Sequence, residues 1–264
     1  MPTPLWQIDA FTSRPFAGNP AAVAFLETPQ DDDWQHQVAE EMNLAETAFL
    51  TPLADGFGLR WFTPAVEVDL CGHATLASAH FLWESGRLEG DMVARFHTRS
   101  GLLTASRDGE WITLDFPATP VSAVPTPHDL AEALGVDLLF VGRSIFDVLV
   151  VVHDAQTVRH LVPDLERLGG RVPARGIIVT APGDEPGIDF VSRFFGPAVG
   201  VPEDPVTGSA HCALGPYWAE RLGRKTLVGF QASKRGGTVR VDVRGDRVLL
   251  AGQAVTVLRG ELEA

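Results

Sequence analysis

Residues 60–68 are R-W-F-T-P-A-V-E-V, and residues 193–201 are R-F-F-G-P-A-V-G-V. Six of these nine positions are identical. Shortly after each copy a glycine, Gly72 or Gly208, begins an apolar segment. Solenoid repeats have periods of roughly 20–50 residues, so a repeat with a period of half the chain indicates two similar, fused lobes.

The apolar segments after these glycines predict helices. The segment Gly72–Glu84 carries Ala, Leu, Phe and Trp around its whole circumference, which is typical of a helix buried on every side. Thr207–Leu222 is its counterpart in the second copy. The copies are 133 residues apart in the first part and 136 in the helix, so the second copy has three extra residues. We place them around residues 201–205, where Glu203 and Asp204 occur.

Short β-branched or aromatic segments bounded by Gly, Pro or Asp predict strands on either side of these helices. Three prolines in residues 118–127 mark a boundary between the lobes. Acidic residues at 31–33 predict the start of a further helix, which continues to Met42. The predicted strands are 5–11, 21–26, 48–50, 59–62, 93–97, 111–116, 138–141, 147–152, 176–180, 189–194, 238–243, 247–250 and 254–258, with short helices near 129–134 and 163–168.

Composition and charge exclude several classes of function. The chain has 264 residues and a net charge of −13, so nucleic acid and anionic membrane surfaces are not expected partners. The N-terminus lacks the features of a signal peptide, and the apolar run at 148–152 is too short to span a bilayer. Two cysteines do not make a secreted disulfide framework. We therefore expect a cytoplasmic protein.

Each predicted buried helix begins with backbone N–H groups that have no partner within the helix. These groups and the positive end of the helix dipole favour a small anion, most simply a carboxylate. We expect Gly72 and His73 to bind substrate at one helix start, and Thr207, Gly208 and Ser209 to bind it at the other. At a helix N-terminus His73 should be neutral near pH 7, because the dipole disfavours a cation there.

Other side chains near these helix starts are candidates for acid–base chemistry. Glu46 is either a solvated residue at the end of a strand or a general base. Cys71 is either a small buried hydrophobe or a thiol with a lowered pKa. Asp204 either shapes a turn or contacts substrate. Because the histidines lack the i,i+4 spacing of H-E-x-x-H, we do not expect a metal site.

Four motifs together resemble the phenazine-biosynthesis PhzF family, which shares the diaminopimelate epimerase fold. They are D-A-F-T-x-x-P-F-x-G-N-P-A-A-V at 9–23, N-L-A-E-T-A-F at 43–49, L-C-G-H-A-T at 70–75 and E-D-P-V-T-G-S-A-H at 203–211. The resemblance implies an α+β fold of two lobes, each a curved, mostly antiparallel sheet or barrel around its central helix. It places the lobes at 1–117 and 118–252, with the C-terminal strand at about 253–264 returning to the first.

The resemblance also implies an active site between the lobes and a homodimer. By motif match, Glu46, His73, Asp204 and Ser209 are the catalytic residues of a biosynthetic enzyme. We therefore expect a cofactor-independent isomerase that moves a proton between carbons of a small carboxylate-bearing substrate. Two alternatives stay open: a one-thiol epimerase or racemase that uses Cys71 on an amino-acid-like substrate, and a non-catalytic, metabolite-binding homodimer.

Overall fold

The computed structural model describes residues 2–263 and divides the chain into two units. The first unit comprises the residues up to Asp115 together with the segment from Ala251 onward, and the second comprises Phe116–Leu250. The boundary predicted after residue 117 lies two residues beyond this division. Each unit combines strands with a few helices, as expected for an α+β fold, and each is described separately below.

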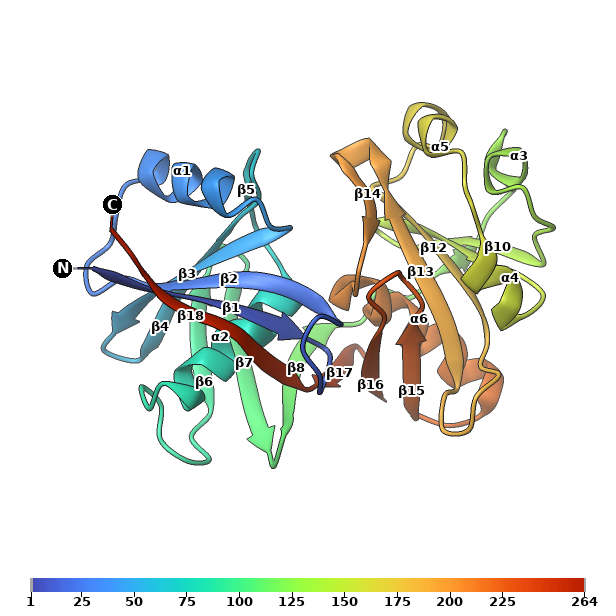
Figure 1. Ribbon diagram of the computed structural model, residues 1–264. Helices are drawn as coiled ribbons and strands as arrows, with labels where there is room; N and C mark the ends of the chain where they lie inside the picture. The colour runs from blue at the N-terminus through green and yellow to red at the C-terminus, as the bar shows by residue number, and fades with distance from the viewer. Residues whose placement is uncertain (1, 264) are drawn as a thin grey trace. The chain divides into compact units, whose positions relative to one another are not determined.

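The first unit is a mostly antiparallel sheet that packs against helix α2 (Figure 1). Its strands pair in the order β18–β1–β2–β3–β4, and β4 continues to β5 and through β6 to β7 and β8. The pairs β2–β3 and β4–β6 are parallel. The strands are β1 (Thr3–Ala10), β2 (Asn19–Phe25), β3 (Glu46–Leu53), β4 (Gly56–Phe62), β5 (Glu67–Val68), β6 (Ala94–Thr98), β7 (Gly101–Asp108), β8 (Trp111–Pro117) and β18 (Ala254–Leu262).

Helix α2 (Gly72–Glu84) has the bounds that the sequence predicts, and nearly all of its residues are buried. It packs against β1, β2 and β3, because its apolar side chains cover its whole surface. Its two buried hydroxyl groups, on Thr75 and Ser78, donate to backbone carbonyls one turn earlier in the helix. Helix α1 (Asp32–Met42) lies at the edge of the unit, and the Asp31 side chain caps it by accepting from the N–H of Trp34.

The second unit repeats the arrangement around helix α6 (Gly208–Leu222), with small helices added at its edge (Figure 1). Its strands pair in the order β9–β10–β11–β12–β13, and β13 pairs with both β14 and β15, which continues to β16. The remaining elements are β9 (Ser122–Ala123), α3 (Leu130–Leu134), β10 (Phe140–Arg143), β11 (Asp147–Val151), α4 (Ala155–His160), α5 (Leu165–Arg171), β12 (Gly176–Pro182), β13 (Phe190–Gly196), η1 (Pro197–Val199), β14 (Val201–Asp204), β15 (Thr226–Gln231), β16 (Gly237–Arg244) and β17 (Arg247–Gly252).

The strand register shows which residues of the two units correspond. Trp61 pairs with Val68 in the first unit, and Phe194 pairs with Asp204 in the second. Arg60 holds Glu67 through two hydrogen bonds of 2.7 and 2.8 Å, and Arg193 holds Glu203 through two of 2.6 and 2.9 Å. This pairing identifies Glu203 as the counterpart of Glu67.

The assignment of Glu203 to the inserted turn was therefore wrong. The three extra residues of the second copy precede Glu203, and β14 begins at Val201, two residues before the counterpart of Glu67, at which β5 begins. The sequence alignment placed Gly200 opposite Glu67, because short identical stretches align without regard to the strand pairing that orients the side chains.

Candidate active site

The first unit brings together three side chains that the sequence singled out. Glu46 is the first residue of β3, Cys71 is the N-cap residue of α2, and His73 is in the first turn of that helix. The Oε2 atom of Glu46 lies 3.3 Å from Nε2 of His73, and Sγ of Cys71 lies 3.5 Å from Nδ1 of the same ring. The imidazole therefore stands between a carboxylate and a thiol.

Asn19, at the start of β2, fixes the state of the His73 ring. Its side-chain Nδ2 lies 3.1 Å from Nδ1 of His73, and an amide NH₂ group can only donate. Nδ1 therefore accepts, and Nε2, the nitrogen that faces Glu46, carries the proton. Sequence reasoning missed Asn19, although it lies in the G-N-P motif, because 54 residues separate it from His73.

His73 is neutral, as expected, but burial is the main reason. Only 4% of the residue is exposed, and loss of hydration lowers its pKa to about 3. The neutral ring can donate from Nε2 without adding a positive charge near the helix start. Glu46 is less deeply buried, with 19% of its side chain exposed, although the Oε2 atom that faces His73 is itself buried.

In the second unit the predicted residues gather at the start of α6. The Thr207 hydroxyl donates to Oδ2 of Asp204 at 2.5 Å, and the Thr207 N–H donates to Oε1 of Gln231 at 2.9 Å. Gln231, a fully buried residue at the end of β15, also donates from Nε2 to the Asp204 carbonyl at 2.8 Å. Gln231 therefore fixes the turn that carries Asp204, a role that sequence reasoning missed.

Ser209 contacts an arginine that sequence reasoning also missed. Arg175 donates from Nη2 to Oγ of Ser209 at 3.0 Å, and from Nε and Nη2 to the Asp147 carboxylate at 2.9 and 2.6 Å. The Asp147 side chain is 2% exposed, whereas that of Arg175 is 37% exposed. The buried aspartate thus orients a guanidinium group that reaches solvent beside a helix start.

The two units place different chemistry at corresponding positions. The parallel pair Ala21–Glu46 matches Asp147–Gly176, so Gly176 occupies the position of Glu46. The helix offset makes Ser209 the counterpart of His73. The first unit therefore carries a carboxylate beside a histidine, whereas the second carries an arginine beside a serine.

Both central helices begin without a side-chain cap. Neither Cys71 nor Thr207 makes a capping hydrogen bond from its side chain. By contrast, Asp31, Asp154 and Asp164 cap the outer helices α1, α4 and α5. A cap would occupy first-turn N–H groups, so its absence leaves donors at Gly72–His73 and Gly208–Ser209 for a ligand.

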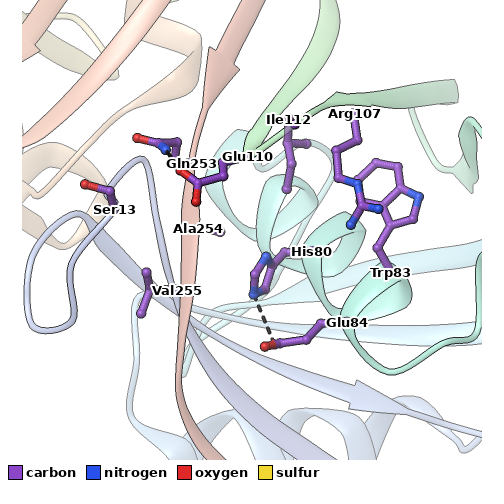
Figure 2. Close-up of a pocket in the computed structure, with 11 residues that line it drawn as sticks. Ser13, His80, Trp83, Glu84, Arg107, Glu110, Ile112, Gln253, Ala254 and Val255 are labelled. Atoms are coloured by element: carbon purple, nitrogen blue, oxygen red, sulfur yellow. Dashed lines mark hydrogen bonds and ion pairs between the residues drawn. The ribbon is translucent and has the colours of Figure 1, made fainter. Parts of the chain in front are cut away.

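A cavity of about 290 Å³ lies elsewhere in the first unit, at the C-terminal end of α2 (Figure 2). Its lining includes His80 and Glu84, whose side chains are 3.1 Å apart, and Arg107, which stacks over Trp83. None of the predicted site residues lines it.

The remaining predicted features concern metals and membranes. Glu46, Cys71 and His73 offer three ligand atoms that all lie within 4.8 Å of one another. The H-E-x-x-H spacing does not describe this group, because it contains a single histidine and its carboxylate comes from β3. No helix in the described part of the chain has the length and apolar character needed to span a bilayer.

The duplicated α+β fold, with a polar cluster at the start of each central helix, is that of the diaminopimelate epimerase-like proteins. It superimposes on a probable proline racemase from Agrobacterium radiobacter with a TM-score of 0.70, 13% identity and coverage of 98% of this chain and 92% of the other, a likeness of fold alone. The chain belongs to the phenazine biosynthesis-like (PhzC-PhzF) protein family, whose model matches residues 8–260.

Two relatives are similar over their whole length. The chain is 54% identical over 263 residues to an uncharacterized isomerase of Halalkalibacterium halodurans, which covers 99% of both proteins. It matches the crystal structure of a phenazine biosynthesis protein of the PhzF family from Enterococcus faecalis with a TM-score of 0.95 and 39% identity, over 100% of both chains. These matches confirm the family and the fold that the motifs predict.

Proposed function

We propose that this protein is a cofactor-independent isomerase that moves a proton between carbons of a small carboxylate-bearing substrate. The observation that carries the proposal is the Glu46 carboxylate, 3.3 Å from Nε2 of a buried, neutral histidine. Membership of the PhzC-PhzF family and the similarity to a relative named as an isomerase support the reaction class.

In this proposal Glu46 takes a proton from an acidic C–H group of the substrate. The electron pair that is left moves along the conjugated system, and Glu46 returns the proton to another carbon, so that no atom is gained or lost. His73 donates from Nε2 to the substrate atom on which negative charge develops. Positioned general acid–base catalysis of this kind contributes about 10²–10⁴ in rate.

The substrate carboxylate is the partner of the donors described above. Backbone N–H groups at Gly72–His73 and at Gly208–Ser209 are uncapped, and Arg175 adds a fixed positive charge beside Ser209. We further propose that Asp204 and Ser209 hold polar groups of the substrate. That residues of both units serve the same substrate molecule stays a prediction from the sequence and its family resemblance.

Exchange of substrate protons with deuterium tests the proposal. The protein is incubated in D₂O with anthranilate-like and amino-acid-like carboxylates, and incorporation is followed by mass spectrometry. Glu46→Gln keeps the shape of the side chain and removes the base, so exchange should fall by about 10²-fold or more. Glu40→Gln makes the same change on the exposed face of α1 and serves as the control. Near-normal turnover by Glu46→Gln would remove Glu46 from this role.

The contact between Cys71 and His73 supports a second candidate, a one-thiol epimerase or racemase of an amino-acid-like substrate. Sγ of Cys71 lies 3.5 Å from Nδ1, the ring nitrogen that accepts, so the thiol is placed to exchange a proton with the imidazole. In that case Cys71→Ser abolishes exchange, whereas Glu46→Gln only lowers it. Tight ligand binding without any deuterium incorporation would instead favour a non-catalytic, metabolite-binding protein.

The proposal extends to the setting in which the enzyme acts. We propose a cytoplasmic homodimer with neither nucleic acid nor a membrane as a partner, on the basis of the family resemblance and the net charge of −13. Light scattering coupled to size-exclusion chromatography measures the mass directly. A single species near 28.4 kDa at micromolar concentration would contradict the dimer.

A further inference from the structure

Glu46, Cys71 and His73 together form a compact set of potential metal ligands, and the proposed acid–base reaction uses only Glu46 and His73. One ligand atom from each residue lies within 4.8 Å of the other two. Cys71 is 6% exposed and His73 is 4% exposed, so the sulfur and the imidazole are held in place by packing. Glu46 has the most exposed side chain of the three, at 19%.

The chemistry of the three ligands selects a particular class of metal ion. Thiolate, imidazole and carboxylate are the ligands of zinc, which binds them at about 2.0–2.3 Å and usually in tetrahedral geometry. Ligand atoms in such a site are about 3–4 Å apart. Sγ of Cys71 lies 3.5 Å from Nδ1 of His73, which is already in this range. Glu46 lies 3.3 Å from the other ring nitrogen, Nε2, so for a metal ion on a single nitrogen the relevant limit is the 4.8 Å that holds between one atom of each residue.

We propose that Glu46, Cys71 and His73 bind one thiophilic divalent cation of the zinc class, and that this cation inhibits the enzyme by occupying the catalytic carboxylate. Binding rests on the geometry of the three side chains, whereas inhibition rests on the proposed function. Three protein ligands leave a fourth position open to water or to a substrate carboxylate, unlike the four ligands of a structural zinc site.

The charges around the cluster define how binding should proceed. A thiolate and a carboxylate together neutralise a divalent cation, and the neutral imidazole adds a nitrogen donor. The positive end of the α2 dipole opposes the cation but favours the thiolate, so we expect reversible binding. The thiol must lose its proton, which passes to solvent, and binding of each metal ion therefore releases about one proton.

Cobalt(II) is the probe for this site, because a cobalt–thiolate bond produces a charge-transfer absorption band in the near ultraviolet. The untagged, metal-free full-length chain is titrated with CoCl₂ in a weakly buffered, thiol-free solution, and absorbance and released protons are recorded together. We expect one equivalent to produce the band, and ZnCl₂ to displace the cobalt and abolish it.

Variants assign the band to the proposed ligands. Cys71→Ser should abolish it, and Glu46→Gln should keep it while weakening binding by about tenfold or more. Cys212→Ala is the matched control: Cys212 is buried inside α6, its pKa is raised to about 12 by burial, and its removal should leave the titration unchanged. Absence of the band in the unmodified chain, its persistence in Cys71→Ser or its loss in Cys212→Ala would overturn the proposal.

The metal titration and the exchange assay can fail independently. If cobalt does not bind but Glu46→Gln loses deuterium exchange, only the metal site is wrong. If cobalt binds as described but Glu46→Gln retains turnover, the proposed function is wrong. Thermal unfolding of each variant checks that it folds, and Glu46→Gln tests the site independently should Cys71→Ser not fold.

Discussion

Removal of the Arg175 side chain should destabilise the protein through Asp147. The Asp147 carboxylate is 2% exposed and accepts two hydrogen bonds from Arg175, at 2.9 and 2.6 Å. Arg175→Met keeps an apolar stem but removes the guanidinium group, which lies over the Phe146 ring, and leaves a buried carboxylate without its cation. Loss of one partner of a buried ion pair costs about 3–5 kcal/mol. Because 37% of Arg175 is exposed, we expect about 2–3 kcal/mol.

Thermal unfolding of four proteins measures this effect. A loss of 2–3 kcal/mol lowers the Tm by roughly 4–12 °C in a chain of this size. Asp147→Asn removes the buried charge, so the double variant with Arg175→Met should recover more than half of that loss. A loss below about 0.5 kcal/mol for Arg175→Met, or a double variant as unstable as Arg175→Met alone, would refute the reasoning.

Ligand binding by the same variants separates stability from function. If Arg175 binds the substrate carboxylate, Arg175→Met raises the KM of a carboxylate substrate more than it lowers kcat. Arg175→Lys keeps the positive charge but loses the planar pair of N–H donors of the guanidinium group. Its effect on KM should therefore be smaller than that of Arg175→Met. An unchanged KM in Arg175→Met at a temperature where the protein is folded would limit Arg175 to a structural role.

Three further predictions concern single side chains. Asn19→Ala removes the donor that holds Nδ1 of His73, so deuterium exchange should fall about tenfold at unchanged folded content. Burial lowers the pKa of His211 to about 4, below its value of about 6.5 in the unfolded chain. The unfolded state therefore takes up a proton first as the pH falls, and stability is lost between about pH 6.5 and pH 4. The loss due to His211 is about 3 kcal/mol and should be absent from His211→Gln, as measured by urea unfolding between about pH 6.5 and pH 4. Equal acid sensitivity of the unmodified protein and His211→Gln would contradict this prediction. Gly229→Ala places a methyl group 2.4 Å from the Phe190 ring and should cost about 1–3 kcal/mol in urea unfolding, whereas Gly170→Ala in α5 meets no atom within 4 Å and should cost nothing.

Much of the candidate site could be predicted because its signals are local in sequence. The N-L-A-E-T and C-G-H motifs identified Glu46, Cys71 and His73, and the structure places all three side chains together. The P-E-D-P-V-T-G-S motif likewise identified Asp204 and Ser209 at the start of α6. A glycine followed by an apolar helical segment is recognisable in the sequence. The unpaired backbone N–H groups at that helix start follow from the helix geometry alone, so they can be predicted without the tertiary structure.

The strands that the sequence did not predict lack such a local pattern. β7 (Gly101–Asp108) and β15 (Thr226–Gln231) each mix polar and apolar residues, and pairing with neighbouring strands holds them in place. The same reason explains the misplaced insertion. An alignment of the two copies compares residue types position by position, whereas the hydrogen bonds between Arg193 and Glu203 form across two strands of the folded sheet.

The sequence by itself determined the duplicated fold, its two central helices and the side chains of the Glu46, Cys71 and His73 cluster, because the internal repeat, the apolar helix pattern and the motifs shared with the family are local in sequence. Only the tertiary structure brought Asn19 to His73, Gln231 to Thr207 and Arg175 to Ser209. These contacts join residues 54, 24 and 34 positions apart, and no spacing rule relates their ends. The physical reason is that strand pairing and burial, which depend on the whole sheet, decide which distant polar groups meet.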